Sequence, residues 1–169
     1  MKAILFIMMW GAAGAAHATS QIPEVLIYNG ASHDLYATPL ETLFSRDHPK
    51  PKLFFEHPSS TACGRGYVGT WKIDNDHLYL VALREGHPRT GVIPLGKVNP
   101  KWVSPVKATW FTGTLRIGKG KVLKAGVGFS EKREKEIFIE IKQGMVTATR
   151  RIDNTQQKQP TGPESGQRE

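Results

Sequence analysis

The chain has 169 residues, a formal net charge of +8 at pH 7 and a single cysteine, Cys63. One cysteine cannot close a disulfide within its own chain, which excludes a small disulfide-stapled scaffold. A chain of this length can bury one hydrophobic core without cross-links, and we expect one domain.

The first eighteen residues have the pattern of a cleaved secretory signal. Lys2 supplies a positive start, residues 3–10 form a short apolar run, and Ala16-His17-Ala18 offers small residues at the cleavage site. The apolar run is shorter than the roughly 20 residues that a membrane-spanning helix needs. We therefore predict a signal peptide at 1–18 and a periplasmic or secreted protein with no transmembrane segment after cleavage.

Short strands and turns are expected in the first third of the mature chain. Residues 24–28 (EVLIY) predict a strand, Asn29-Gly30 is a strong hairpin-turn signal, and a second strand is expected around 34–37. Residues 39–44 predict one helical turn, with a proline near its start. The compact apolar run at 52–56 (KLFFE) predicts a further strand.

The clearest unit is residues 66–83, GYVGTWKIDNDHLYLVAL. Tyr67 and Trp71 fall on one face of an alternating pattern, and Asp74-Asn75-Asp76 has turn chemistry. The return half is apolar on both faces, which predicts a strand inside a sheet that is covered on two sides. This unit predicts a hairpin whose aromatic side chains, including Tyr79, belong to the core.

The next stretch mixes loop and strand signals. Residues 85–105 hold four prolines and predict a loop with at most an edge strand at 93–95. Residues 107–117 (KATWFTGTLRI) alternate and predict a strand, Gly118-Lys119-Gly120 predicts a turn, and residues 122–129 predict the returning strand.

A second hairpin is expected near the end of the chain. Residues 130–135 (SEKREK) predict a solvated loop, and residues 136–142 predict a strand with three isoleucines facing the core. Gln143-Gly144 predicts a turn and residues 145–150 the returning strand. Residues 155–169 contain no large apolar side chain, so we expect a disordered polar tail.

Together these patterns predict a mostly β fold in one domain over residues 19–154. Several hairpins at regular spacing indicate an antiparallel meander with at most one or two short helices. A partly open barrel and a two-layer sandwich both fit the pattern, and the sequence does not choose between them.

The positive charge is concentrated in one stretch of sequence. No acidic residue occurs between Glu85 and Glu131, while eight Lys and Arg residues do. Such a field attracts an acidic protein or polyanion, and aromatic side chains among the lysines suit a binding hot spot. Packing beneath the loop and a merely solvated surface are the alternatives. The predicted binding residues are Trp102, Trp110, Arg89, Lys97, Lys101 and Lys107.

Residues suited to catalysis are few. A working thiol nucleophile needs a lowered pKa and an orienting partner, and the sequence shows neither for Cys63. A buried, inert thiol is the favoured interpretation of this residue. The histidines lack the i, i+4 spacing of a helical zinc site, and we predict no catalytic residue, no metal site and no cofactor.

Three stretches carry a resemblance to a family: IPEVLIYNG, RGYVGTWKIDNDHLYLV and WFTGTLRIGKGKVL, the last followed by GVGFS and EKEIFIEIKQGMV. They span most of residues 22–146. The chain resembles a group of uncharacterised bacterial single-domain β-rich proteins of unknown function. The resemblance implies a single domain and no particular activity, and no role for Cys63 comes from it.

These observations lead to two functional hypotheses. The first is an exported, non-catalytic binding domain of the cell envelope, of inhibitor or immunity type, that uses a basic surface. Its partner would be a protein or an anionic envelope polymer, because location disfavours nucleic acid. The second is an envelope-acting hydrolase that uses Cys63, His57 or His87. A purely structural envelope component is a third reading, and the oligomeric state is left open.

Overall fold

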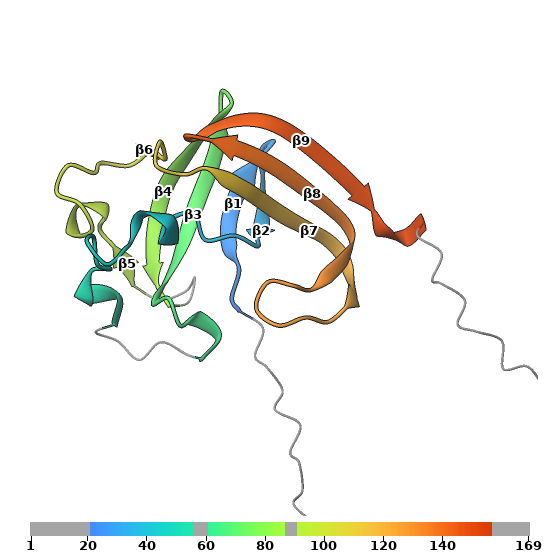
Figure 1. Ribbon diagram of the computed structural model, residues 1–169, viewed down its shortest axis with the longest axis horizontal. Coiled ribbons are helices and arrows are strands. Elements are labelled where there is room, and N and C mark those ends of the chain that lie inside the picture. The colour runs from blue at the N-terminus through green and yellow to red at the C-terminus, as the bar shows by residue number, and fades with distance from the viewer. Residues whose placement is uncertain (1–20, 56–60, 87–90, 157–169) are drawn as a thin grey trace, which may run out of the picture.

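The computed structural model describes residues 21–55, 61–86 and 91–156, and strands dominate this part of the chain (Figure 1). The predicted signal peptide and most of the predicted tail lie outside these residues. The strands are β1 (Glu24–Tyr28), β2 (Ala31–Leu35), β3 (Tyr67–Asp74), β4 (His77–Glu85), β5 (Val92–Ile93), β6 (Val106–Lys107), β7 (Gly113–Lys124), β8 (Lys132–Lys142) and β9 (Met145–Asp153). Short 3-10 helices lie at Glu41–Leu43, Lys52–Phe55, Thr61–Cys63, Leu95–Lys97 and Asn154–Gln156.

Seven strands close into a barrel. Their order is β3-β1-β2-β7-β8-β9-β4, and β4 pairs with β3 to complete the ring. The remaining short strands, β5 and β6, both pair with β4 outside this ring. The predicted β-rich fold is confirmed, and the barrel is the form that it takes. One pairing departs from a pure antiparallel meander, since β1 and β3 run parallel.

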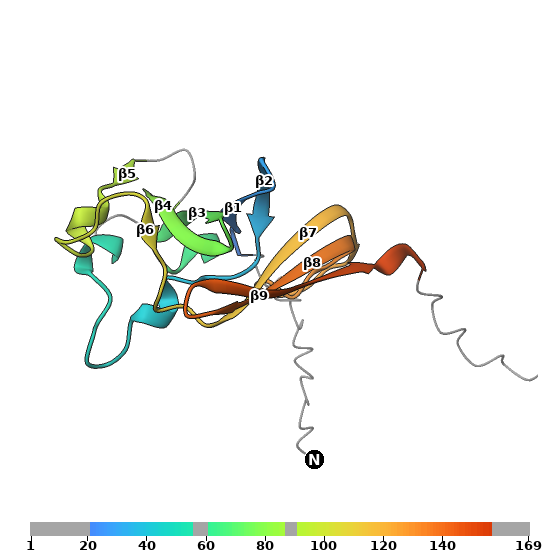
Figure 2. The ribbon, with the colours of Figure 1, turned by 90° about the horizontal axis from the view of Figure 1, so that it is seen from above.

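The barrel closes through two narrow seams. Strands β2 and β7 meet only at Leu35 and Ile117, and β4 and β9 meet only at His77 and Met145. Beside the second seam, the Leu78 amide donates to the Gly144 carbonyl over 2.8 Å. Seen from above, β1 to β4 and β7 to β9 therefore form two sheets that diverge away from the seams (Figure 2). This geometry explains why the sequence pattern fits a barrel and a sandwich equally well.

The three expected hairpins with short turns all form. Strand β1 pairs with β2 around Asn29-Gly30, β3 with β4 around Asn75-Asp76, and β8 with β9 around Gln143-Gly144. In each turn the non-glycine residues that adopt positive φ are Asn, Asp or Gln. Asparagine and aspartate tolerate this conformation better than other side chains do, which makes such turns readable from sequence.

Two strand predictions are wrong in their extent. Residues 118–120 do not turn the chain, because β7 continues to Lys124 through irregular register on either side of Val122. The returning strand is not 122–129 but β8, which begins inside the stretch predicted as a solvated loop. The glycines serve as strand irregularities: Gly120 has φ +78° and lies against Glu134.

Two apolar runs also differ from expectation. Residues 52–55 form a 3-10 helix instead of a strand, since Pro51 fixes φ at its start and its carbonyl accepts the Phe54 amide at 3.2 Å. The predicted strand at 107–117 is interrupted, because a turn from Ala108 to Phe111 separates β6 from β7. Burying Ala108 and Phe111 in the core compensates for the lost strand pairing.

The core fills the barrel between the two sheets. Trp71 and Tyr67 are its largest fully buried side chains, which confirms two of the three predicted core aromatics, and Tyr79 is half-buried. The fully buried aliphatic side chains on strands come from five strands, β1, β2, β4, β7 and β8: Leu26, Leu35, Leu78, Leu80, Leu83, Leu115, Ile117 and Ile139. Ile141 is also buried, whereas Ile137 is only half-buried.

Replacing Gly144 by alanine is expected to weaken the seam between β4 and β9. An added Cβ would lie 2.7 Å from the Ala108 carbonyl oxygen, in a residue with φ +78°. Gly30 is a matched control, because its φ is +74° and no atom lies within 4 Å of an added Cβ. We expect Gly30→Ala to cost about 1 kcal/mol and Gly144→Ala about 3 kcal/mol in urea unfolding. Equal losses would contradict the steric account of this seam.

Candidate functional site

Four of the six predicted binding residues, Lys97, Lys101, Trp102 and Lys107, lie on a segment that pairs with β4 through β5 and β6. Ile93 in β5 and Leu95 are buried, and β6 pairs with β4 at the other end of the segment. Between these anchors the Trp102 amide donates to the Asn99 carbonyl at 2.9 Å. The segment from 91 to 107, here called the basic platform, is thus held at both ends although little of it is strand.

Cationic and apolar side chains project from the basic platform. Lys97, Lys101 and Lys107 are all exposed, and none lies within ion-pair distance of a carboxylate in the described part of the chain. Val103 is 81% exposed and Val92 is 61% exposed, the former being the most exposed large aliphatic side chain described. The platform therefore presents uncompensated positive charge beside accessible apolar area. Arg89, the remaining predicted residue, lies outside the described residues.

Two of the predicted residues, Trp102 and Trp110, are brought together as a stacked pair. Their ring centroids are 5.1 Å apart and the planes are inclined by 13°. Trp110 also makes an edge contact with buried Trp71 at 6.4 Å, and its Nε1 donates to the Pro39 carbonyl at 3.2 Å. Both stacked rings are half-buried. They couple the platform to the core, so their main contact is with the protein itself.

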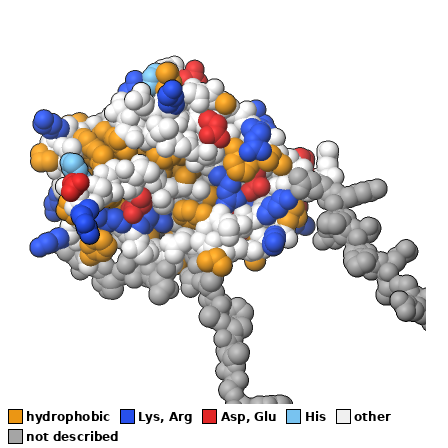
Figure 3. Space-filling model, in the orientation of Figure 1, with side chains coloured by type: hydrophobic (Ala, Val, Ile, Leu, Met, Phe, Trp, Pro, Cys, Tyr) orange, Lys and Arg blue, Asp and Glu red, His pale blue; other side chains and the backbone are white. Residues whose placement is uncertain are grey.

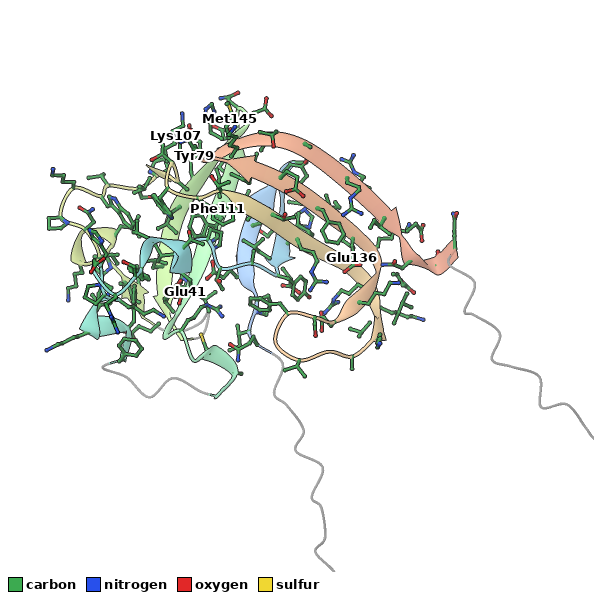
Figure 4. All side chains as sticks on the ribbon, viewed as in Figure 1. Glu41, Tyr79, Lys107, Phe111, Glu136 and Met145 are labelled. Carbon is green, nitrogen blue, oxygen red and sulfur yellow. The ribbon has the colours of Figure 1, made fainter. Side chains whose placement is uncertain are left out.

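A shallow hollow adjoins the platform where β4 meets β9. Its volume is about 340 Å³, and it is lined by β4, β6, β8, β9, the turn between β8 and β9, and Thr109. Lys107 and Met145 lie close together there, beside Tyr79 of β4 (Figure 4). The Nδ1 atom of His77 is engaged with the Asn75 carbonyl at 2.7 Å. The lining residues are His77, Lys107, Thr109, Lys142, Gln143, Met145 and Thr147, which include no carboxylate.

The fold divides the basic stretch of sequence into two parts. Lys97, Lys101 and Lys107 belong to the platform on β4, whereas Lys119, Lys121 and Lys124 lie along the far half of β7. Both ribbon views place these two regions at opposite ends of the molecule (Figures 1 and 2). The sequence interpretation of one continuous basic region therefore corresponds to two separate surfaces.

Cys63 is fully buried, and its thiol contacts the Tyr67 carbonyl at 3.2 Å. Burial raises the pKa of the Cys63 thiol above its usual range, although the nearby Arg65 guanidinium opposes the shift. The thiolate that nucleophilic chemistry requires is thus disfavoured. His57 and His87, the other residues of the hydrolase hypothesis, lie outside the described residues.

Glu24 is a buried acid that the sequence patterns did not identify. The Glu24 carboxylate is fully buried, accepts a hydrogen bond from Trp71 Nε1 at 2.5 Å and lies 3.2 Å from Arg65 Nε. Gly69 is required beneath it, since an added Cβ would lie 2.7 Å from both Glu24 Oε2 and Trp71 Nε1. The available signal was the alternation in β1, which places Glu24 on the same face as the core residue Leu26.

A second buried carboxylate, Glu136, lies in β8 (Figure 4). Arg116 Nη1 donates to Glu136 Oε1 at 2.5 Å, and Asn154 Nδ2 donates to Glu136 Oε2 at 2.9 Å. Arg116 further donates to the backbone carbonyls of Phe129 and Glu131. This network satisfies the charges within the protein and fixes the chain that follows β7.

Neither cluster has the composition of a metal site. No group of three His, Cys, Asp or Glu side chains suited to holding a metal ion occurs among the residues for which the structure gives positions. Over those same residues, no helix is long and apolar enough to cross a bilayer. Comparison with protein-family models, curated proteins and solved structures finds no match to this chain.

Stability is expected to fall between pH 5 and 8 through Glu24. Burial, opposed by Arg65 and Trp71, raises the folded-state pKa of Glu24 from 4.5 to about 7. Between these two pH values the folded state holds a proton that the unfolded state releases. The stabilisation from this proton is complete below about pH 4.5 and is lost as pH rises through 7. The slope is at most about 1.4 kcal/mol per pH unit.

Glu24→Gln removes this titration, so its unfolding free energy in urea should lack the fall attributed to Glu24. Glu140→Gln is the control for the loss of one carboxylate, because Glu140 is exposed on β8. A wild-type curve with the same slope as Glu24→Gln would show that Glu24 is not the titrating group.

Proposed function

We propose that this protein is an exported, non-catalytic binding domain of the cell envelope that holds an acidic protein partner on the basic platform. An inhibitor or immunity role, in which the domain blocks a secreted enzyme, is the specific form of this proposal. The observation that carries it is the combination, on one anchored segment, of three exposed lysines with two highly exposed valines.

The charge on the platform supports an acidic partner. Lys97, Lys101 and Lys107 have no carboxylate within ion-pair distance among the residues described. Their electrostatic field therefore extends into solvent and attracts an acidic partner. Complementary charge accelerates encounter and excludes partners of like charge. These effects contribute more to specificity and association rate than to the strength of the final contact.

The apolar area supports a protein rather than a polysaccharide or other polymer. Val92 and Val103 are more than half exposed, and the centres of protein interfaces are richer in apolar area than their rims. The platform is anchored by Leu95, β6 and the Trp102–Trp110 stack. A surface that is already ordered loses less conformational freedom on binding.

Reversing the three platform charges should weaken capture of the partner. Lys97→Glu, Lys101→Glu and Lys107→Glu are combined in one variant, and a matched variant carries the same change at Lys119, Lys121 and Lys124. Membrane-free envelope extract is passed over each immobilised protein, and the captured protein is then titrated in purified form. We expect the platform variant to bind about 100-fold more weakly and the matched variant to bind as the wild type does. Equal weakening in both would indicate a response to net charge and would refute a local platform.

Cys63→Ala is expected to leave partner capture unchanged. The Cys63 thiol is fully buried and its pKa is raised, so it offers no nucleophile to a substrate. The small cavity left by the sulfur should cost about 1 kcal/mol in urea unfolding, which leaves the protein folded. If Cys63→Ala were folded by circular dichroism but failed to replace the wild-type protein in the cell, the hydrolase hypothesis would be supported instead.

A further inference from the structure

The outer end of the β7–β8 hairpin, residues 119–129, exposes apolar side chains that the strand pattern should have buried. Val122, Leu123 and Val127 are 46%, 49% and 66% exposed. Val122 and Leu123 are adjacent in sequence, and the register of β7 against β8 shifts on both sides of Val122. The regular alternation of faces is lost there, so both side chains reach solvent.

These apolar side chains are surrounded by positive charge. Residues 119–135 contain six Lys or Arg and two Glu, a formal charge of +4. Lys119, Lys121 and Lys124 are exposed, and no carboxylate of the described residues lies within ion-pair distance of them. Basic and hydrophobic side chains occur together over the lower right of the molecule, where this hairpin lies (Figure 3).

The two acidic residues within 119–135, Glu131 and Glu134, are engaged by groups of the same stretch. Glu131 forms an ion pair with Arg133 at 2.7 Å, and Glu134 Oε2 accepts the Lys121 amide at 3.1 Å. Burial raises the pKa of Glu131, but hydrogen bonds from Arg133 and Tyr36 outweigh it and lower that pKa below its ordinary value. These carboxylates therefore stabilise the hairpin, and none of them forms an ion pair with Lys119, Lys121 or Lys124.

The backbone of the hairpin end is held in place from the inside. Arg116 donates to the carbonyls of Phe129 and Glu131, and Arg133 Nη1 donates to the Gly120 carbonyl at 3.1 Å. The Ser130 amide closes a turn onto the Val127 carbonyl at 3.0 Å. The exposed valines and leucine are thus presented by an anchored loop.

We propose that the hairpin end from Lys119 to Phe129 binds the surface of an anionic lipid bilayer. Val122, Leu123 and Val127 enter the boundary between headgroups and acyl chains, while Lys119, Lys121 and Lys124 bind lipid phosphates. Aliphatic side chains ringed by lysine are the chemistry of interfacial membrane attachment. Lys121 and Lys124 directly flank Val122 and Leu123 in the sequence, and all four side chains are exposed, so positive charge and apolar area lie together at the hairpin end.

The first test measures sedimentation of the purified protein with vesicles. Vesicles of phosphatidylcholine containing about one third phosphatidylglycerol should bind the protein, and pure phosphatidylcholine vesicles should not. Combined Lys119→Glu, Lys121→Glu and Lys124→Glu should weaken binding about 100-fold, since each lysine near an anionic surface contributes roughly tenfold or less. The platform variant with reversed Lys97, Lys101 and Lys107 has the same net charge and should bind vesicles as the wild type does.

The second test locates the apolar contact. Leu123→Cys and Val103→Cys are each labelled with an environment-sensitive dye, and native Cys63 escapes labelling because it is fully buried. The dye at position 123 should shift to the blue with anionic vesicles, whereas the dye at position 103, on the platform, should not. Combined Val122→Ser, Leu123→Ser and Val127→Ser should weaken vesicle binding at least tenfold while all lysines remain.

Three outcomes would overturn the proposal. They are equal loss of vesicle binding in both charge-reversed variants, an unchanged dye spectrum at position 123, and loss of the acidic protein partner only when the hairpin lysines are reversed. The last outcome would make the hairpin end a protein surface. Since the platform and the hairpin are tested with separate variants, either proposal can fail while the other stands.

Discussion

Trp71 is the side chain through which the barrel and its outer segment are held together. It is fully buried on β3, its indole nitrogen donates to Glu24 on β1, and its ring meets the edge of Trp110. Trp110 in turn stacks on Trp102 of the basic platform. One side chain thus fixes the parallel β1–β3 pairing from the inside and supports the platform from below.

This central contact matters because the barrel is closed by few strand pairs. Each seam contributes a single pair of opposed residues, so backbone ladders cannot by themselves keep the two sheets together. Side chains between the sheets must supply that cohesion, and burying a large aromatic side chain stabilises by about 2–3 kcal/mol. The same requirement explains a buried carboxylate at the centre, since Glu24 orients the Trp71 ring at the expense of a raised pKa.

Local patterns were sufficient where the determining contacts are local. Asn29-Gly30 and Gln143-Gly144 set their turns through residues that tolerate positive φ, and the alternating pattern in 67–83 correctly places Tyr67 and Trp71 in the core. The Gly118-Lys119-Gly120 stretch fails as a turn because its conformation is decided by distant residues. Gly118 packs against Arg133 and Tyr36, and Gly120 packs against Glu134. No window of sequence around these glycines contains that information.

The predicted binding residues show the same difference between features set by local sequence and features set by distant contacts. Composition correctly identifies that Lys97, Lys101 and Lys107 are exposed, because lysine is rarely buried. Composition cannot show that Trp102 and Trp110 stack on each other, since the contact depends on the turn at 108–111 that ends β6. Their half-burial makes them supports of the platform, and the exposed apolar area comes from Val92 and Val103 instead.

Because the basic stretch forms two separate surfaces, its positive charges do not act as one electrostatic field. Electrostatic attraction between exposed groups is screened over about 8–10 Å at physiological ionic strength. Lysines on the platform and on the β7–β8 hairpin, at opposite ends of the barrel (Figure 1), therefore act on different neighbours. The platform lysines lie beside Val92 and Val103, and the hairpin lysines lie beside Val122, Leu123 and Val127. No carboxylate of the described residues forms an ion pair with Lys97, Lys101, Lys107, Lys119, Lys121 or Lys124. Under the two proposals the platform meets an acidic protein and the hairpin end meets an anionic bilayer, and the barrel sets the separation between them.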